Sequence, residues 1–577
     1  MNRFYARCRL GTYVLTVSGL CLAAGAHATE KSAGAHAIEK SVGAPGCAHE
    51  SPQQCVTAAL EAMGGRERLQ QVVSVRLQTV GHTLLMEQSY RQAPFITSYE
   101  RGSTTMDLAN QRLLKEAKLT WPESDPNQSD SDTTLLVGPE GGVYHTNFGD
   151  SPCSLGDLDA SRQVLALGPA RVLLTAAGAS DLHFEAPTTL RSTFHAVVAF
   201  SWGRIPVRVL LNPFNHLPDA VETTQVFHDF WYFWGDVQQR IYYDNWRLVE
   251  GITFPTNSVE ERNGVVWSST QALDVEFDVQ IDEKSFDMNA GAVKQSAASP
   301  GWNRPFSLKQ ATTLAPGIDL YAGSWNATVV KERDGIIIVE APISGLYTQG
   351  VVRQARKRYP GMRVSAVLST SDSWPHTGGV RQAVALGLPV YILDLNQPLL
   401  DRMVLAPHTM EPDALQKAKI SKAPHWKIVA GKQEIGSGAN RMELYPLRGA
   451  STERQYMVYF PEHRLLYASD TLALNDDGTL YDPELMYEVA QAVKRENLIV
   501  DTVFATHQGP MPWEKVVALI EKSRSRGIPQ ADSVGPRSAH FAFSSASSDF
   551  APYTLSSASR MMAGCTAIAR LFAASNQ

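Results

Sequence analysis

The stretch LSTSDSWPHTGGV, Leu368–Val380, gathers side chains that can do nucleophilic, acid–base or metal chemistry. Its histidine, His376, follows Ser371, Asp372 and Ser373 within a few residues. A serine nucleophile served by His376 needs an activating base beside it, but nothing resembling the G-x-S-x-G turn surrounds either serine. Asp372 is a candidate metal ligand, and its short carboxylate also suits the capping of a turn among these serines. These alternatives stay open at the level of the sequence.

The elements around this stretch predict a layered α/β arrangement. A strand-like run leads into it and a helical pattern, GVRQAVALG, follows it. From Leu314 onward strand-like and helical segments alternate, including the strands DGIIIVEAP, LPVYILDLN and DTVFAT and the amphipathic helix DPELMYEVAQAVKREN. Such alternation is typical of a sheet with helices packed on it. We therefore predict an α/β domain at residues 306–526.

Four segments of this region, in order, resemble the metallo-β-lactamase superfamily. GSWNATVVKERDGIIIVEAP is similar to the first hairpin, and VSAVLSTSDSWPHTGG is similar to the strand and loop that normally read HxHxDH before Gly-Gly. YMVYFPEHRLLYASD is similar to the strand pair that ends in the bridging aspartate, and VFATHQGP to the last strand with its metal-binding histidine. The resemblance implies an αββα sandwich with its site on loops that follow strands.

Most ligands of the family's first metal are replaced in this chain. When the last histidine of the motif is placed on His376, the two preceding histidines fall on Ser371 and Ser373, and the aspartate falls on Pro375. A serine hydroxyl is a weak donor at neutral pH and proline offers no ligand. The family's third histidine would fall within RGASTER, Arg448–Arg454, which contains none. The resemblance thus implies that the first metal site is lost.

Three positions of the family's motif are retained, His376, Asp470 and His507. The resemblance gives both histidines to the second metal, makes Asp470 the bridging ligand, and implies catalytic roles for Asp470 and His376. Two imidazoles and a carboxylate are enough for one zinc ion with an open position. Without the missing aspartate, the same three groups can instead persist as a hydrogen-bonded network with no metal. Both outcomes, one zinc ion or an empty site, stay open.

The region before the sandwich, residues 51–289, is predicted to be an antiparallel β-sheet domain. It opens with SPQQCVTAALEAMGG, in which Ser51 is a good helix N-cap, Pro52 suits the first turn, and two glycines end the helix. Apolar residues then alternate with polar ones, as at Val207 and Val209. ALEAMGG, YYDNWRLVEGITFP and VQIDEKSF resemble the curved β-sheet domains of the lipoprotein-carrier type. That resemblance implies a concave apolar face able to hold an acyl chain.

Three further segments have a composition that differs from the rest of the chain. FHDFWYFWGD, Phe227–Asp236, holds six aromatics in eight residues, which predicts an interior strand with an edge, or else the lining of an apolar ligand groove. Small and polar residues predict an exposed linker at 290–305. The Ser/Ala-rich tail at 527–577 is expected to be a loose helix or disordered.

The N-terminus has the features of a secretory signal peptide. Arg3, Arg7 and Arg9 precede a short apolar run and then Ala-His-Ala, and the run is too short for a membrane span. We expect residues 1–28 to be cleaved near Ala28, residues 29–50 to form a flexible leader, and the protein to be periplasmic or secreted.

Four cysteines remain after that cleavage, namely Cys47, Cys55, Cys153 and Cys565. Export makes disulfides possible, and four cysteines allow three pairings. Among these we favour Cys47 with Cys55, because both flank the start of the first helix.

Chain length and net charge limit the number of domains and the kinds of partner. A chain of 577 residues is too long for one ordinary core, and a net charge of -6 without a basic block argues against nucleic-acid binding. We therefore expect an α+β and α/β two-domain protein, with a curved antiparallel β-sheet domain before an αββα sandwich. Three roles stay open: a metal-dependent hydrolase with at most one residual zinc ion, a non-catalytic periplasmic binding protein for a lipid or other small apolar ligand, and a structural role.

Overall fold

The computed structural model describes residues 46–87, 95–120, 131–146, 149–307, 310–418, 423–475 and 477–524. The expected signal peptide at 1–28, most of the leader at 29–50 and the tail at 527–577 lie outside these residues. Within the described ranges, no helix has the length and apolar character that a membrane crossing requires. The described residues belong to one compact unit that begins at Gly43, and the domain boundaries expected within it stay a prediction.

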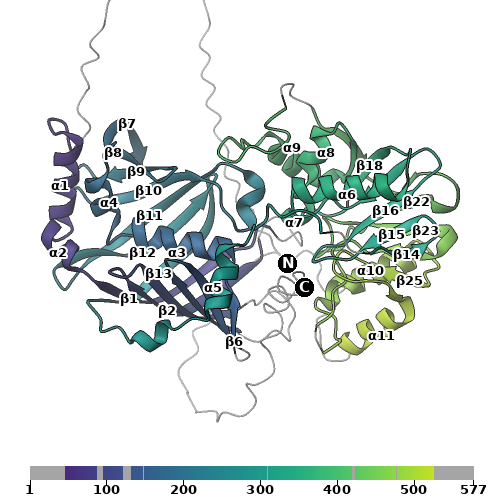
Figure 1. The fold of residues 1–577 in the computed structure, drawn as a ribbon, viewed down its shortest axis with the longest axis horizontal. Helices are drawn as coiled ribbons and strands as arrows, with labels where there is room; N and C mark the ends of the chain where they lie inside the picture. Colours follow the sequence, from purple (N-terminus) through teal and green to yellow (C-terminus); the bar gives the residue numbers. More distant parts are fainter. Residues whose placement is uncertain are drawn as a thin grey trace, which may run out of the picture. The chain divides into compact units, whose positions relative to one another are not determined.

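Alternating apolar and polar residues build one thirteen-stranded antiparallel sheet (Figure 1). Its spatial order is β6-β5-β4-β3-β2-β1-β13-β12-β11-β10-β9-β8-β7, so that the first and last strands pair with each other at its middle. The strands are β1 (Ser74–Leu84), β2 (Thr97–Asp107), β3 (Arg112–Thr120), β4 (Ser131–Gly138), β5 (Gly141–Thr146), β6 (Gly149–Pro152), β7 (His183–Leu190), β8 (Thr193–Trp202), β9 (Ile205–Leu211), β10 (Pro218–Gln225), β11 (Val237–Val249), β12 (Ile252–Arg262) and β13 (Val265–Phe277). The β-rich character expected from period-two patterning is confirmed for this region.

Helices pack against this sheet, with α1, α2 and α4 sharing its largest apolar cluster and α3 and α5 packing on opposite faces of β4. The helical elements are α1 (Pro52–Ala62), α2 (Arg66–Gln71), α3 (Leu155–Leu167), α4 (Val172–Gly178), η1 (Phe230–Trp234), η2 (Glu283–Phe286) and α5 (Ala290–Ala297). Val56 and Leu60 of α1 and Leu173 of α4 are buried in the same cluster as Val198 and Val209 of the sheet. This cluster shows that α1 and α4 cover part of the sheet, and the concave face expected to hold an acyl chain stays a prediction.

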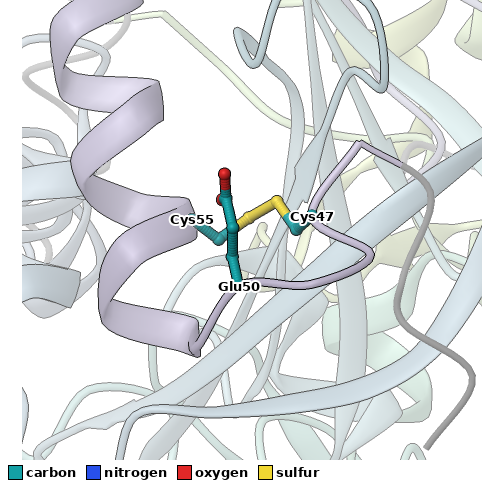
Figure 2. Close-up of side chains that lie close together, drawn as sticks. All are labelled: Cys47, Glu50 and Cys55. Atoms are coloured by element: carbon teal, nitrogen blue, oxygen red, sulfur yellow. A yellow bond between two sulfur atoms is a disulfide. The ribbon is translucent and has the colours of Figure 1, made fainter.

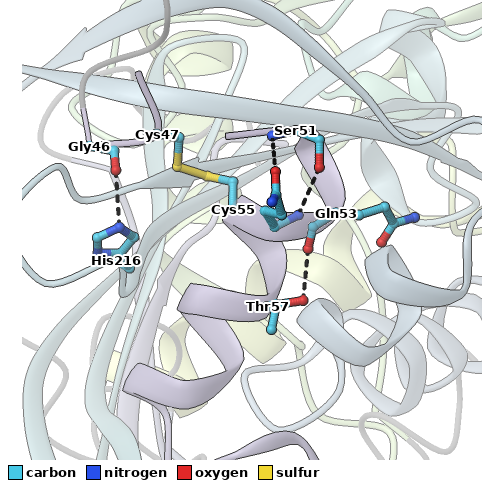
Figure 3. Close-up of a disulfide and its surroundings, with 8 residues drawn as sticks. Gly46, Cys47, Ser51, Gln53, Cys55, Thr57 and His216 are labelled. Carbon is cyan, nitrogen blue, oxygen red and sulfur yellow. Dashed lines mark hydrogen bonds between the residues drawn. A yellow bond between two sulfur atoms is a disulfide. The ribbon is translucent and has the colours of Figure 1, made fainter. Parts of the chain in front are cut away.

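Helix α1 begins as its sequence predicts. The Ser51 hydroxyl accepts a hydrogen bond from the Gln54 N–H at 3.3 Å, the Gln54 side chain accepts from the Ser51 N–H at 2.8 Å, and Pro52 occupies the first turn. Cys47 and Cys55 form the favoured disulfide across this start (Figure 3).

Beside the disulfide, the Glu50 side chain lies near both sulfur atoms (Figure 2). Sulfur atoms that are bonded to each other are not thiolates, and thiolates are the form of cysteine that binds metal. Cys47, Cys55 and Glu50 are therefore not a metal site, and the disulfide is a structural cross-link.

The second half of the chain contains two further sheets. The seven-stranded sheet has the order β14-β15-β16-β17-β18-β19-β20, with β14 (Thr312–Ala315), β15 (Ile318–Tyr321), β16 (Ala327–Lys331), β17 (Ile336–Val339), β18 (Val364–Ser369), β19 (Pro389–Leu393) and β20 (His425–Val429). The six-stranded sheet has the order β21-β22-β23-β24-β25-β26, with β21 (Gln433–Ile435), β22 (Met442–Pro446), β23 (Tyr456–Phe460), β24 (Leu465–Tyr467), β25 (Thr502–Phe504) and β26 (Met511–Pro512). The helical elements of this half are α6 (Gly345–Arg358), α7 (Trp374–Thr377), α8 (Val380–Ala385), η3 (Asp394–Asn396), α9 (Gln397–Leu405), η4 (Gly438–Asn440), η5 (Pro461–His463), α10 (Pro483–Arg495) and α11 (Trp513–Arg524).

These sheets and helices stack in four layers. One core, which includes Val339, Leu368 and Phe460, lies between the two sheets. A second core joins the outer face of the seven-stranded sheet to α6, α8 and α9, and a third joins the six-stranded sheet to α10 and α11. In Figure 1 the first group of helices and the second lie on opposite sides of the strands. The chain's own topology is therefore the α-β-β-α arrangement that was expected here.

Two local predictions are wrong. The aromatic stretch at 227–236 is not an interior strand, because residues 230–234 form the 3-10 helix η1, capped by Asp229, whose carboxylate accepts from the Trp231 N–H at 2.7 Å. The first part of the expected linker is the helix α5, in which Ala292 and Ser296 are buried. Asn289 caps α5, so this part is a short helix, although its other small residues, Ala290, Gly291 and Ala297, are exposed.

Candidate metal centre

Three loops that follow strands bring the predicted ligands together. His376 lies in the short helix α7 after β18, Asp470 follows β24, and His507 follows β25. Strands β24 and β25 are parallel neighbours, so their carboxyl ends share one edge of the sheet. The Thr506 N–H donates to the Ser469 carbonyl at 3.0 Å and fixes these two loops side by side.

The Asp470 carboxylate lies between the two imidazoles. Its Oδ2 is 3.0 Å from His376 Nε2, and its Oδ1 is 3.1 Å from His507 Nε2. The His376 side chain is 1% exposed and that of His507 is 28% exposed, so the cluster runs from the interior to the surface. Donor atoms of all three residues lie within 4.8 Å of one another.

A backbone carbonyl orients the outer imidazole. His507 Nδ1 is 2.9 Å from the Ser324 carbonyl oxygen, which can only accept, so this nitrogen carries the proton. In a neutral imidazole the lone pair then lies on Nε2 and faces the Asp470 carboxylate. Two lone pairs at this distance repel unless a proton or a cation lies between them. The same carbonyl-to-histidine contact orients many metal-binding histidines.

A second carboxylate, Glu340, faces the inner imidazole. Glu340 follows β17, is 0% exposed and has a φ of 74°, a conformation that non-glycine residues rarely adopt. Its Oε2 is 4.0 Å from His376 Nδ1, and its Oε1 accepts from the Thr370 N–H at 3.2 Å. Glu340 was not among the site residues predicted from the sequence. The feature that could have indicated it is its position directly after the apolar run IIIV.

The charges of this cluster shift one another's pKa values. Burial lowers the pKa of His376, but the charge and hydrogen bond of Asp470 and the charges of Glu340 and Asp372 outweigh it, and the pKa lies above its ordinary value. Burial raises the pKa of Asp470, but His376 and His507 outweigh it and hold that pKa far below its usual range. Burial raises the pKa of Glu340, a shift that His376 and Thr370 only partly offset. The cluster therefore favours the protonated form of His376 and the ionised form of Asp470.

The positions that the resemblance aligns with the family's other ligands hold buried neutral groups. Ser371 and Ser373 are 0% and 4% exposed, and the Ser371 hydroxyl accepts from the Ser373 N–H at 3.1 Å. Ser371 thus makes a turn bond in this loop, and the turn bond expected from Asp372 stays a prediction. Asp372 itself is buried, and its charge acts on His376. Pro375 accepts from the Ile343 N–H at 2.7 Å through its carbonyl.

Near the position of the family's third histidine, the chain is tied to helix α10. The Ser451 N–H donates to the Glu488 carboxylate at 3.0 Å, and the Thr452 hydroxyl donates to it at 2.6 Å. These hydrogen bonds pair polar groups of the loop with the Glu488 carboxylate. The hypothesis of a serine nucleophile gains no support, because both ring nitrogens of His376 face carboxylates.

Other histidines of the sandwich lie away from the cluster. His408 lies in a loop, where burial and the nearby Arg381 lower its pKa to about 4. His425 is exposed at the start of β20, and His463 is 2.9 Å from the Asn440 side-chain oxygen. Among the described residues, none of these three belongs to the group that could hold a metal ion with His376.

Comparisons with known proteins give only weak likenesses. No family model matches the chain, and no curated protein matches it. Among solved structures, the stereoselective inverting sec-alkylsulfatase Pisa1 from Pseudomonas sp. is 14% identical with a TM-score of 0.28, over 37% of this chain and 40% of its own. The DIM-1 metallo-β-lactamase is 16% identical with a TM-score of 0.30, over 38% of this chain and 98% of its own. A metallo-β-lactamase from Pontibacter korlensis is 16% identical with a TM-score of 0.29, over 37% and 98%.

These neighbours are metallo-β-lactamases and an alkylsulfatase, each matched over less than two fifths of this chain. The match spans well under half of the alkylsulfatase. The lipoprotein-carrier-like assignment of the first half stays a prediction.

Proposed function

We propose that this protein is a hydrolase-like member of the metallo-β-lactamase superfamily whose remaining centre, His376, Asp470 and His507, holds a single zinc ion. The observation that carries this proposal is the Asp470 carboxylate between two imidazole nitrogens at 3.0 and 3.1 Å. The three positions that the resemblance aligns with the first metal's histidines hold Ser371 and Ser373 or lie within 448–454, which has no histidine, and Pro375 stands in place of the second metal's aspartate. A second ion therefore has no imidazole ligands.

The residues present fit one zinc ion by their donor chemistry. The Ser324 carbonyl fixes the His507 tautomer so that the lone pair of Nε2 is free to bind a metal ion. Asp470 supplies the charge, and His376 supplies the second imidazole once it releases its proton. The chemistry that such an ion supplies when bound is Lewis-acid activation of an oxygen of water or substrate. Asp470 and His376 would hold or move the proton in that reaction, with Glu340 beside His376 as a further carboxylate.

Weak or lost hydrolase activity is part of the proposal. A two-metal site stabilises both the attacking and the leaving oxygen, and one ion with three ligands lacks half of that stabilisation. A non-catalytic binding protein for a small or lipid-like ligand is the second candidate. The buried serines at the lost ligand positions favour it.

The test is a calorimetric zinc titration of the wild type and of two variants. We expect one tight site in the wild type, a loss of affinity of at least about 10-fold for His507→Ala, and no change for the exposed His425→Ala control. Hydrolysis of model lactam, thioester and phosphoester substrates is expected to be weak and to be abolished by chelation. Unchanged affinity in His507→Ala would refute the assignment of the ligands. Zinc binding without hydrolysis would agree with the lost activity of the first proposal, and a lipid that co-purifies with the protein would favour the binding-protein alternative.

A further inference from the structure

The aromatic segment, defined here as η1 (Phe230–Trp234), is held firmly at both ends. At its start the Asp229 carboxylate caps the segment and accepts from the Arg262 guanidinium at 2.6 Å. At its end Gly235 has a φ of 65°, and a Cβ there would lie 2.2 Å from the Pro407 carbonyl oxygen. Asp236 then accepts from the Thr409 N–H at 2.8 Å. The segment therefore bridges the thirteen-stranded sheet and the loop that precedes β20.

Behind the cap lies a buried polar chain within the thirteen-stranded sheet. Arg262 is 3% exposed, stacks between the rings of Phe227 and Trp267 at 3.9 and 3.4 Å, and donates to Glu260 at 2.7 Å. Glu260 also accepts from the Gln239 side chain at 2.7 Å. A buried, fully paired arginine of this kind has little freedom to move. The aromatic segment is thus anchored to strands β11 and β12.

A first contact route leads from the segment to His376. Trp374 is 3% exposed and lies edge-on between Trp231 and Trp234, with ring centroids 5.0 and 5.4 Å apart. Its backbone N–H donates to the Glu87 carbonyl at 3.2 Å. Trp374 precedes His376 by two residues in the four-residue helix α7, which is too short to hold its own position.

A second route leads from the same segment to His507. Phe233 lies edge-on to Trp302 at 5.3 Å, Trp302 to Trp325 at 5.5 Å, and Trp325 to the His507 ring at 5.4 Å. Edge-to-face pairs at these separations are favourable and orientation-specific. The two routes reach opposite sides of the Asp470 carboxylate.

We propose that the aromatic segment is a positioning element of the candidate metal centre: Trp231 and Trp234 set the place of His376 through Trp374, and Phe233 sets that of His507 through Trp302 and Trp325. The inference extends the proposed function, since it assigns the N-terminal sheet a role in building the centre. Neither histidine is held by a long helix or by the middle of a strand, so packing from this segment supplies the rigidity that a metal site needs.

The test is hydrogen–deuterium exchange of the full chain in the presence of a chelator, which makes the result independent of zinc binding. The reporters are two peptides, residues 372–380, where the His376 N–H donates to the Ser373 carbonyl at 2.9 Å, and residues 505–509, where the Thr506 N–H donates to Ser469 at 3.0 Å. In Trp231→Ala we expect at least about 10-fold faster exchange in the first peptide. Trp231→Phe should restore most of the protection.

Trp302→Leu should instead accelerate exchange at 505–509 and leave 372–380 near the wild-type rate. Phe214→Ala, an 86% exposed aromatic of the same sheet, is the control and should change neither peptide. Unchanged exchange in both peptides would overturn the proposal. So would equal acceleration of both peptides in both variants, since that pattern means general destabilisation. Zinc affinity is measured separately. An absence of zinc binding would count against the proposed function and not against this positioning role.

Discussion

Replacing Asp470 with asparagine tests whether the buried charges of the cluster stabilise the folded chain. The carboxylate is 13% exposed and is bonded to two imidazoles. A hydrogen bond between charged groups, here the one between His376 and Asp470, contributes about 1.5–3 kcal/mol, and the contact with His507 is not counted because that side chain is partly open to solvent. Asparagine keeps one oxygen that can accept from one imidazole. We therefore expect Asp470→Asn to lower the free energy of unfolding by about 2–3 kcal/mol in metal-free protein.

The pH dependence of that loss follows from the two pKa shifts. The pKa of Asp470 is lowered from 3.8, so its contribution is complete above 3.8 and is lost as the pH falls toward the shifted value. The pKa of His376 is raised from 6.5, so its contribution is complete below 6.5 and is lost as the pH rises through the raised value. The difference between wild type and Asp470→Asn should thus be largest between pH 3.8 and 6.5 and smaller at alkaline pH.

The assay is urea denaturation with a chelator, followed by tryptophan fluorescence at pH 5.5 and pH 9. Asp501→Asn is the control, because Asp501 pairs with Arg464 at 3.7 Å on an exposed surface and should change stability by less than about 0.5 kcal/mol. An equal effect of Asp470→Asn at both pH values would refute the account of a charged His376–Asp470 pair. A loss under about 0.5 kcal/mol at pH 5.5 would do the same.

Two further predictions concern the thirteen-stranded sheet. Arg262→Met should lower the free energy of unfolding by about 3–5 kcal/mol, because it leaves Asp229 and Glu260 without their buried partner; denaturation of this variant beside exposed Arg247→Met measures it, and equal stabilities would contradict it. Reduction of the Cys47–Cys55 disulfide, which closes a loop with a sequence separation of 8, should cost about 2–3 kcal/mol; thermal unfolding with and without a reductant tests this, and an unchanged midpoint would count against it.

Local signals in the sequence were enough for much of the fold. Helix α1 could be placed from its serine cap, its proline and its terminal glycines, because capping is a short-range effect. Strands of the first sheet were visible from alternation, and the strand pair β23–β24 followed from the resemblance of YMVYFPEHRLLYASD to the family's segment. His376, Asp470 and His507 were named from the same resemblance, and the structure brings their side chains together.

What the sequence could not supply depends on contacts between distant segments. The aromatic stretch at 227–236 reads as a strand by composition, but Trp231 finds its partner Trp374 more than a hundred residues away. Glu340 is one of many acidic residues until β17 and β18 pair and place it beside His376. The Ser324 carbonyl that orients His507 has no side-chain signature at all.

Native mass spectrometry of the purified protein with a small excess of zinc counts the bound ions per chain. We expect one zinc ion per chain in the wild type and none in Asp470→Ala, with the exposed His425→Ala control still holding one. Two tightly bound ions in the wild type, or one that persists in Asp470→Ala, would contradict a single centre built from His376, Asp470 and His507.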